Sequence, residues 1–174
     1  MLNFVRHTIA NNGRPSAPFR SRFEHTLRVM KWAERLQASE GGDLEVLRIA
    51  ALFHDVGWDP ERPHEEVGAE ITQEYLNNSG LSEDKIATIV EAVAHHNHRS
   101  SPGPFNKETL IIQDADILDE VGVLTLVWDS LATAHRPKPS YRAVYERALK
   151  SLDELQKRAH QLRTPSGRRF YDEQ

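Results

Sequence analysis

Apolar residues recur at intervals of three and four along most of this chain, and no segment alternates apolar with polar residues. Spacing of three and four places apolar side chains on one face of an α-helix, whereas a half-buried strand requires alternation. Clusters of glycine, proline and asparagine interrupt the pattern and mark the ends of helices. We therefore predict an all-α fold, in which a single-domain helical bundle is built from about six main helices.

The caps and apolar stripes define where these helices begin and end. Ser21, Asp43, Ser82 and Asn106 are suited to helix N-termini, and Pro63 suits the entry to a helix beginning near His64. The predicted helices cover about residues 21–38, 43–54, 64–76, 82–96, 106–134 and 141–159, and the segment 135–139 with its two prolines ends the fifth of them. The segment 106–128 is unusually apolar, so we expect it to be central to the core.

The two ends of the chain show little periodicity. Residues 1–18 contain Gly13, Pro15 and Pro18, and we predict an irregular N-terminal arm. Residues 164–174 are polar and contain Pro165 and Gly167, so we predict a loose C-terminal tail. The domain itself is then expected to span residues 19–163.

Composition restricts the class of protein. The 174-residue chain has no cysteine, which excludes disulfides and thiolate metal sites. Its net charge of −4 argues against a stable nucleic-acid partner. No apolar run approaches the roughly 18 residues of a membrane span, and no secretory signal is visible. We expect a cytoplasmic protein without a membrane partner, and a homo-oligomer is left open.

The positions of the histidines are more informative than their number, which is nine. His54, His64 and His96 end or begin predicted helices on their apolar faces, and His25 lies on an apolar stripe. Asp116 lies inside the most apolar helix. A single inward histidine is more often a hydrogen-bonded core residue than a ligand. Several inward imidazoles and carboxylates in one core would be costly, and a bound cation would give each lone pair a partner.

Three motifs in order resemble the HD-domain superfamily of metal-dependent phosphohydrolases. They are residues 23–29 around His25, residues 51–57 around the adjacent pair His54 and Asp55, and residues 113–118 around Asp116. In that family these four residues hold one divalent metal within an all-α bundle. The resemblance covers about residues 20–130 and implies a bundle of the HD-domain type.

Two further features are similar to family members with six or more ligands. The segment starting at His64 resembles the motif that supplies a histidine after the His-Asp pair, and His95 and His96 resemble the paired histidines that follow. This resemblance implies one or two divalent transition-metal ions (Mn, Fe, Ni, Co or Zn, with Mg also compatible), with Asp55 bridging two of them. The chain departs from the family where His64 follows Asp55 by only nine residues and where Trp58 replaces an acidic or basic residue.

The resemblance implies hydrolysis of a phosphoester of a nucleotide or another small phosphate compound by a metal-activated water. We assign the catalytic roles to Asp55 and Asp59, although an aspartate before proline is also ordinary turn chemistry. Four arginines lie near the motifs, and each can be interpreted either as a phosphate contact or as a solvated charge: Arg22, Arg28, Arg62 and Arg99. Glu24 is a candidate for orienting His25.

Two other classes of function are consistent with the same residues. Some proteins similar to this family use the six-ligand site with two irons for oxygen-dependent cleavage, so a di-iron oxygenase is one alternative. A non-catalytic ligand-binding module is the other. The intact ligand set argues against the binding module, because a degenerate site would have lost ligands.

Overall fold

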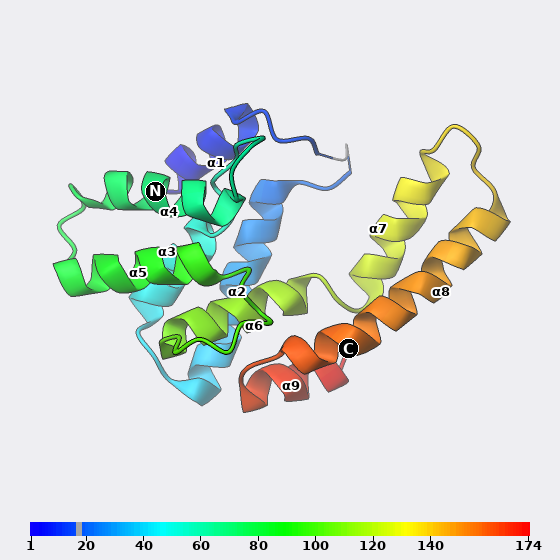
Figure 1. The fold of residues 1–174 in the computed structure, drawn as a ribbon. Helices are drawn as coiled ribbons and strands as arrows, with labels where there is room; N and C mark the ends of the chain where they lie inside the picture. Colours follow the sequence, from blue (N-terminus) through cyan, green and yellow to red (C-terminus); the bar gives the residue numbers. More distant parts are fainter. Residues whose placement is uncertain (17–18) are drawn as a thin grey trace.

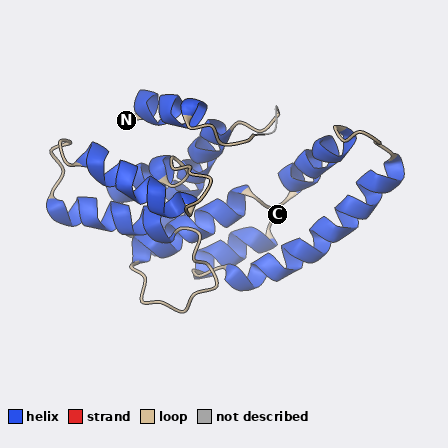
Figure 2. Cartoon of the chain, turned by 45° about the horizontal axis from the view of Figure 1, so that its top comes forward, coloured by secondary structure: helices blue, strands red, loops and turns tan. Residues whose placement is uncertain are grey.

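The computed structural model describes residues 1–16 and 19–174, and these residues form helices and no strand (Figures 1 and 2). The all-α prediction is confirmed, and the described residues contain nine α-helices where about six were expected. They are α1 (Leu2–Asn11), α2 (Arg22–Glu40), α3 (Leu44–Phe53), α4 (His64–Leu76), α5 (Glu83–His95), α6 (Lys107–Asp119), α7 (Val123–Ala134), α8 (Tyr141–Arg158) and α9 (Pro165–Asp172), with a 3-10 turn at Ala159–Gln161.

A bundle of α2 to α6 forms the body of the molecule (Figure 1). In it α2 packs on α3 and α6, while α5 packs on α3, α4 and α6. The cap predicted at Asp43 is present, because its side chain accepts hydrogen bonds from backbone N–H groups in the first turn of α3. At the other predicted helix starts, the side chains of Ser21, Ser82 and Asn106 also accept hydrogen bonds from the first turns of α2, α5 and α6. The core lies between these helices and is filled by fully buried side chains such as Leu36, Phe53 and Ile89.

The prediction of an irregular N-terminal arm is wrong for residues 2–11, which form α1. Val5 is completely buried, and the Phe4 ring lies 4.3 Å from that of Tyr75. A ten-residue helix without a side-chain cap is unstable on its own, so its local signal is weak and tertiary packing stabilises it. Residues 17–18 of the predicted arm lie outside the described part of the chain.

The prediction of a loose C-terminal tail is also wrong, because residues 165–172 form α9. Thr164 caps this helix, and the buried carboxylate of Asp114 in α6 accepts hydrogen bonds from Thr164 N at 2.8 Å and Thr164 Oγ1 at 2.7 Å. Gly167 is needed at this contact, since a Cβ there would lie 2.2 Å from Asp114 Oδ2. The end of the chain is thus fixed to the most buried helix of the bundle.

The single helix predicted over residues 106–134 is two helices, α6 and α7. α6 ends at Asp119, and Gly122 follows with φ of +75°, a conformation that favours glycine and turns the chain away from the bundle. Ten of the thirteen residues of α6 are buried, as expected for a central helix. In α7, Thr133 is the one buried residue, so the expectation that residues 123–128 belong to the core is wrong.

Helices α7 and α8 form a hairpin that extends to the right of the bundle in Figure 1. None of the described helices combines the length and the apolar character needed to cross a bilayer.

Candidate metal centre

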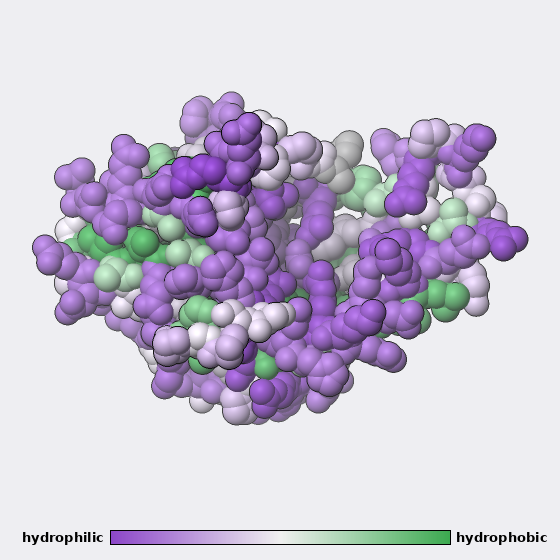
Figure 3. Space-filling view, viewed as in Figure 1, coloured by the Kyte–Doolittle hydropathy of each residue, from purple (hydrophilic) through white to green (hydrophobic). Residues whose placement is uncertain are grey.

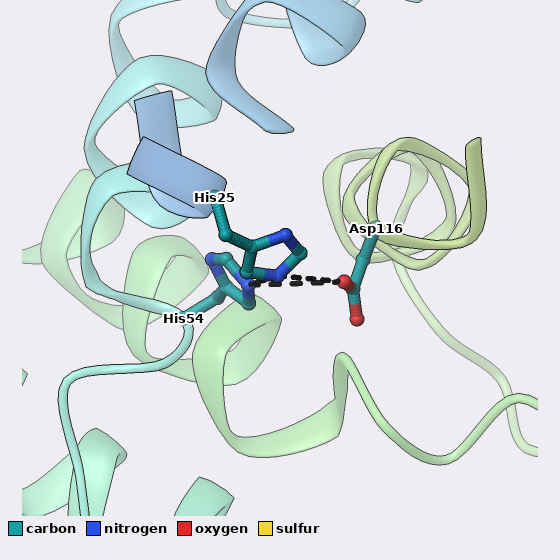
Figure 4. Close-up of side chains that lie close together, drawn as sticks. All are labelled: His25, His54 and Asp116. Atoms are coloured by element: carbon teal, nitrogen blue, oxygen red, sulfur yellow. Dashed lines mark hydrogen bonds and ion pairs between the residues drawn. The ribbon is translucent and has the colours of Figure 1, made fainter. Parts of the chain in front are cut away.

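His25, His54 and Asp116 converge in the buried centre of the bundle, and we call them the deep triad (Figure 4). His25 comes from α2, His54 follows the last turn of α3, and Asp116 comes from α6. The Nε2 atom of His25 lies 3.2 Å from Nε2 of His54 and 3.2 Å from Oδ1 of Asp116. All three side chains are at least 96% buried, with exposures of 4% or less.

Asp55, His64 and His96 form a second group, which we call the outer triad. His64 begins α4 and His96 follows the last turn of α5. The Nε2 atom of His64 lies 3.1 Å from Nε2 of His96 and 3.4 Å from Oδ1 of Asp55. In both triads the candidate ligand atoms all lie within 4.8 Å of one another.

All four histidines of the two triads use their Nδ1 atom outside the centre. Nδ1 of His54 lies 2.7 Å from the Ala51 carbonyl and that of His96 lies 2.8 Å from the Val93 carbonyl. Those of His25 and His64 lie 2.6 Å from Asp119 Oδ2 and 2.9 Å from Glu65 Oε2. In a neutral imidazole, an acceptor at Nδ1 keeps the hydrogen on that atom, and the lone pair of Nε2 is then available to a metal.

A close backbone approach brings His64 into the outer triad despite the short link from Asp55. A Cβ at Gly57 would lie 2.2 Å from the Gly68 nitrogen and 2.3 Å from the His64 carbonyl oxygen. Glycine at position 57 therefore allows the first turn of α4 to lie directly against the end of the His-Asp segment. The link of nine residues is sufficient because no side chain separates these two backbones.

Three arginines neutralise the two carboxylates. Arg14 Nη1 lies 2.7 Å from Asp55 Oδ1, and Arg22 Nη1 lies 2.5 Å from Asp55 Oδ2. Arg99 forms an ion pair with Asp116. Both oxygens of Asp55 thus accept hydrogen bonds from arginines. Asp55 was expected to join His25, His54 and Asp116 at the first metal, but the structure groups it with His64 and His96.

Burial and charge set the protonation of the centre. Burial would lower the pKa of His25, but hydrogen bonds to Asp116 and Asp119 raise it to about 10. Burial lowers the pKa of His54 and of His64, and it lowers the pKa of His96 to about 3. Burial alone would raise the pKa of Asp55, whereas His54, Arg22 and Arg14 hold it well below its ordinary value. The centre therefore contains ionised carboxylates and neutral imidazoles, except for a protonated His25.

Some of the predicted site residues lie outside the two triads. His95 points away, with Nδ1 at 3.0 Å from Nδ1 of His98, because adjacent residues of a helix diverge by about 100°. The Asp59 side chain accepts a hydrogen bond from Glu61 N at 2.8 Å, as in turn chemistry. Arg62 forms an exposed ion pair with Glu70.

Sequence reasoning missed three contributors to the centre. Asp119, not Glu24, orients His25, and it also binds Arg28 at 2.8 Å. Asp119 lies one helical turn after Asp116 on the same face, which is a signal that could have identified it. Glu65, in the first turn of α4, was not among the predicted site residues, and Arg14 lies in the segment that was expected to be irregular.

The triads open into a small cavity of about 240 Å³. Its polar wall includes His25, Asp55, His64, His96 and Asp116, together with Arg14, Arg22, Arg99 and Arg158. Imidazole and carboxylate donors in this combination suit Mn, Fe, Co, Ni or Zn. The residues present therefore fit a divalent metal, with positively charged side chains beside it.

Comparison with known proteins agrees with this geometry. The family model described as the HD domain matches residues 22–120. Ribonuclease Y of Aliarcobacter butzleri is 32% identical over 137 residues, which cover 76% of this chain and 22% of that protein. Ribonuclease Y of Enterococcus faecalis is 27% identical over 137 residues, with 75% and 22% covered. The chain thus spans less than a quarter of the length of these curated relatives.

Solved structures share the fold over nearly the whole chain. An HD superfamily hydrolase from an uncultured Thermotogales bacterium superposes with a TM-score of 0.63 at 25% identity, over 90% of this chain and 87% of the other. Bacillus subtilis YpgQ, solved in complex with ADP, superposes with a TM-score of 0.68 at 19% identity, over 99% and 84%. At that identity the likeness to YpgQ concerns the fold alone.

Proposed function

This chain belongs to the HD-domain family, and from that premise we propose that it is a metal-dependent phosphohydrolase that cleaves a phosphoester of a nucleotide or another small phosphate compound. The family consists of hydrolases whose HD domains bind divalent metals. The convergence of the deep and outer triads beside a cluster of arginines is the observation that supports the proposal.

The residues of the two triads have the roles of metal ligands in this proposal. His25, His54 and Asp116 would hold one ion, and His64, His96 and Asp55 would hold a second. Divalent ions held there would supply a nucleophilic water at neutral pH and positive charge beside the phosphoryl oxygens. Asp119, Glu65 and the carbonyls of Ala51 and Val93 keep the imidazoles oriented for that purpose.

The arginines supply a site for the phosphoryl group. Guanidinium groups bind phosphate with two parallel hydrogen bonds and remain charged at any pH of interest. Arg14, Arg22 and Arg99 each contact a carboxylate of the centre and line the same cavity. In the proposed complex they hold the phosphate oxygens next to the ligands.

An adjoining cavity supports a nucleotide as the substrate. A space of about 670 Å³ between α1 and α2 shares Arg14 and Arg22 with the metal cavity. Its other wall includes the apolar side chains of Ile9, Phe23 and Leu27. A phosphate held by the shared arginines would place an attached nucleoside against this apolar wall. YpgQ binds ADP and Ribonuclease Y is named for RNA, so nucleotides and RNA both belong among the substrates to test.

The proposal is tested by metal analysis followed by a substrate panel. Protein loaded separately with Mn, Co, Ni, Zn, Fe or Mg is assayed on nucleoside mono-, di- and triphosphates, sugar phosphates, phosphodiesters and short RNA. Release of phosphate, pyrophosphate or cleaved RNA without dioxygen consumption supports hydrolysis. Iron-dependent dioxygen uptake during turnover would instead identify an oxygenase, and metal-loaded protein that turns over none of the panel would favour a binding module.

A matched pair of aspartate variants tests the site assignment. We expect Asp55→Ala to abolish metal retention and activity together, because Asp55 is buried and is one of the proposed ligands. Asp59→Ala serves as the control, since its side chain accepts only a local turn hydrogen bond, and it should retain the metal. An Asp55→Ala protein that kept both the metal and full activity would refute the assignment.

A further inference from the structure

Glu120 lies on the wall of the metal cavity but has no part in the proposed hydrolysis. It follows the last residue of α6 and lies one helical turn after Asp116. It also lines two adjoining cavities, one of about 130 Å³ at the base of the α7–α8 hairpin and one of about 200 Å³ beside the start of α2. Among the described residues, Glu120 thus lies where the metal cavity meets both of these spaces.

Three arginines converge on this carboxylate. Nη2 of Arg20 lies 2.9 Å from Oε1 of Glu120, and Nη1 of Arg158 lies 2.8 Å from Oε2. Nη1 of Arg99 lies 4.0 Å from Oε2, and Arg99 also forms an ion pair with Asp116. Both oxygens of Glu120 are therefore occupied by guanidinium groups, which are the side chains best suited to bind phosphate.

Two of the three arginines come from segments outside the family match, which covers residues 22–120. Arg20 precedes α2, and its guanidinium carbon lies 4.5 Å from the centre of the Trp128 ring on α7. Arg158 is the last residue of α8. Figure 3 shows mainly hydrophilic surface (purple) where the hairpin meets the bundle. The packing of the hairpin on the bundle produces this cluster, and the family match does not account for it.

The same arginines would form a phosphate site if Glu120 carried no charge. Arg158 lines the metal cavity and so lies next to the phosphoryl group in the proposed complex. The nucleoside would extend the other way, past Arg14 and Arg22 into the cavity of about 670 Å³. A second phosphate on the far side of the reacting group would therefore meet Arg20 and Arg158, whose guanidinium groups are already paired with Glu120.

A carboxylate in this position disfavours a second phosphate by its charge. The phosphate would lie against the like charge of Glu120 and would have to displace it from both arginines. Juxtaposed like charges suppress unwanted partners, and a protein can obtain specificity in this way. A side chain that belongs to the same molecule also competes at a high effective concentration. Glu120 is thus an internal anion that occupies the place of the second phosphate.

We propose that Glu120 is a specificity-determining residue that restricts the substrate to one whose reacting phosphoryl group is terminal. The proposal rests on the hydrolytic function proposed above and narrows its substrate class. In such a substrate water forms a new bond to phosphorus, the bond from phosphorus to the ester oxygen breaks, and that oxygen takes up one proton of the water. The products are inorganic phosphate and a hydroxyl compound, and release of pyrophosphate from a nucleoside triphosphate is excluded.

The test is the binding of AMP and ADP to metal-free protein, measured by calorimetric titration, with inorganic phosphate and pyrophosphate measured alongside. In the unaltered protein ADP should bind no more tightly than AMP. Glu120→Gln keeps the size of the side chain and an oxygen that accepts from arginine. It should tighten the binding of ADP and of pyrophosphate by at least about tenfold and leave that of AMP and phosphate within about threefold.

A matched control and a second variant separate charge from structure. Glu154→Gln is the control, because Glu154 lines the cavity of about 130 Å³ and pairs with Arg147 but is not part of the metal cavity wall. Arg158→Ala in the Glu120→Gln protein should remove the gain for ADP. Circular dichroism and melting temperatures verify that each variant is folded. With Mn-loaded protein and ATP, the unaltered chain should release no pyrophosphate, whereas Glu120→Gln should release it.

Several results would overturn this role of Glu120. They are ADP binding more than about tenfold tighter than AMP binding in the unaltered protein, an unchanged ratio in Glu120→Gln, an equal gain in Glu154→Gln, and no binding of any of the four anions by Glu120→Gln. A protein that shows the expected binding ratios but hydrolyses no phosphate compound would support the role of Glu120 and contradict the hydrolytic function alone.

Discussion

The deep and outer triads use the same kinds of donor but are held in place differently. The deep triad lies on three helices of the bundle core, and each of its members is buried. In the outer triad His64 is only partly buried, and its position depends on the close approach of Gly57 and Gly68. Core packing therefore fixes all three members of the deep triad, whereas one member of the outer triad, His64, is positioned by a backbone contact.

The two triads also differ in charge. Asp116 lies against a protonated His25 and Arg99, while Asp55 is bound by Arg14 and Arg22 and lies beside imidazoles with lowered pKa values. A cation entering the deep triad must displace a proton from His25. At the outer triad both imidazoles are already neutral. Although the two triads contain the same types of ligand, we therefore predict that they bind their ions with different affinity and with different pH dependence.

The largest expected effect is that of His25→Ala. Removal of this imidazole takes a proposed ligand from the deep triad and a hydrogen-bond partner from each of the buried carboxylates of Asp116 and Asp119, which then keep only their contacts with Arg99 and Arg28. We expect loss of the bound ion and a fall in kcat/KM of at least about 10³-fold, equivalent to about 4 kcal/mol. Metal content by mass spectrometry and steady-state kinetics measure both. His160→Ala, at an exposed histidine, is the control, and retention of two ions by His25→Ala would contradict the assignment.

A smaller effect is expected for His64→Ala, which removes a ligand from the outer triad alone. We expect the metal content to fall by one ion per chain and kcat/KM to fall by about 10–100-fold, because the deep triad remains intact. Titration of the metal-free variant with Mn or Co measures the stoichiometry. If His64→Ala lost both ions and as much activity as His25→Ala, the two triads would form one inseparable site.

Most of the residues that form the two triads could be predicted from the sequence. The stripe through Ile89 and Val93 continues to His96 and not to His95, so helical periodicity alone favours His96, and the structure follows it. The assignment of His25, His54 and Asp116 to one place depended on motif order, because their separation in the chain carries no local signal. Family resemblance supplied that non-local information.

The remaining features depend on tertiary contacts that the sequence does not encode locally. Arg14 follows α1 in a segment without periodicity, and it reaches Asp55 only because α1 packs on the bundle. The burial of α6 and the exposure of α7 also have no local cause, since the exposed helix α7 has the more apolar sequence of the two. Gly122 marks the boundary, but only the packed structure shows that the chain leaves the core there.

The pH dependence of metal binding should separate the triads further. The pKa of His25 is raised to about 10, so below that pH a metal competes with a proton for this imidazole. The affinity of the deep triad for a metal ion should therefore rise by up to about tenfold per pH unit between pH 6 and 9. Burial lowers the pKa of His64 and His96, so affinity at the outer triad should be nearly constant above pH 6.5.

The proton released on binding gives an independent measurement of the same difference. Calorimetric titration in buffers of different ionisation enthalpy should give about one proton per ion for the His64→Ala protein, which retains only the deep triad. In the metal-free protein, the protonated His25 contributes stability that is complete below pH 6.5 and is lost as the pH rises towards 10. Equal proton release at both triads would remove the electrostatic distinction between them.

The smallest effect is expected for the carboxylates that orient the imidazoles, and it should again differ between the triads. Glu65→Gln keeps an oxygen that can accept from Nδ1 of His64, so we expect affinity at the outer triad to fall by no more than about tenfold, with activity restored at a higher metal concentration. Asp119→Asn should cost more, because Asp119 contacts both His25 and Arg28 and is 1% exposed. His98→Ala is the control for Glu65, since Nε2 of His98 lies 3.7 Å from Oε1 of the same carboxylate, whereas His64 contacts Oε2. If His98→Ala reduced metal affinity as much as Glu65→Gln, Glu65 would act through general charge and not by orienting His64. The outer triad would then lack the oriented imidazole that Asp119 provides in the deep triad.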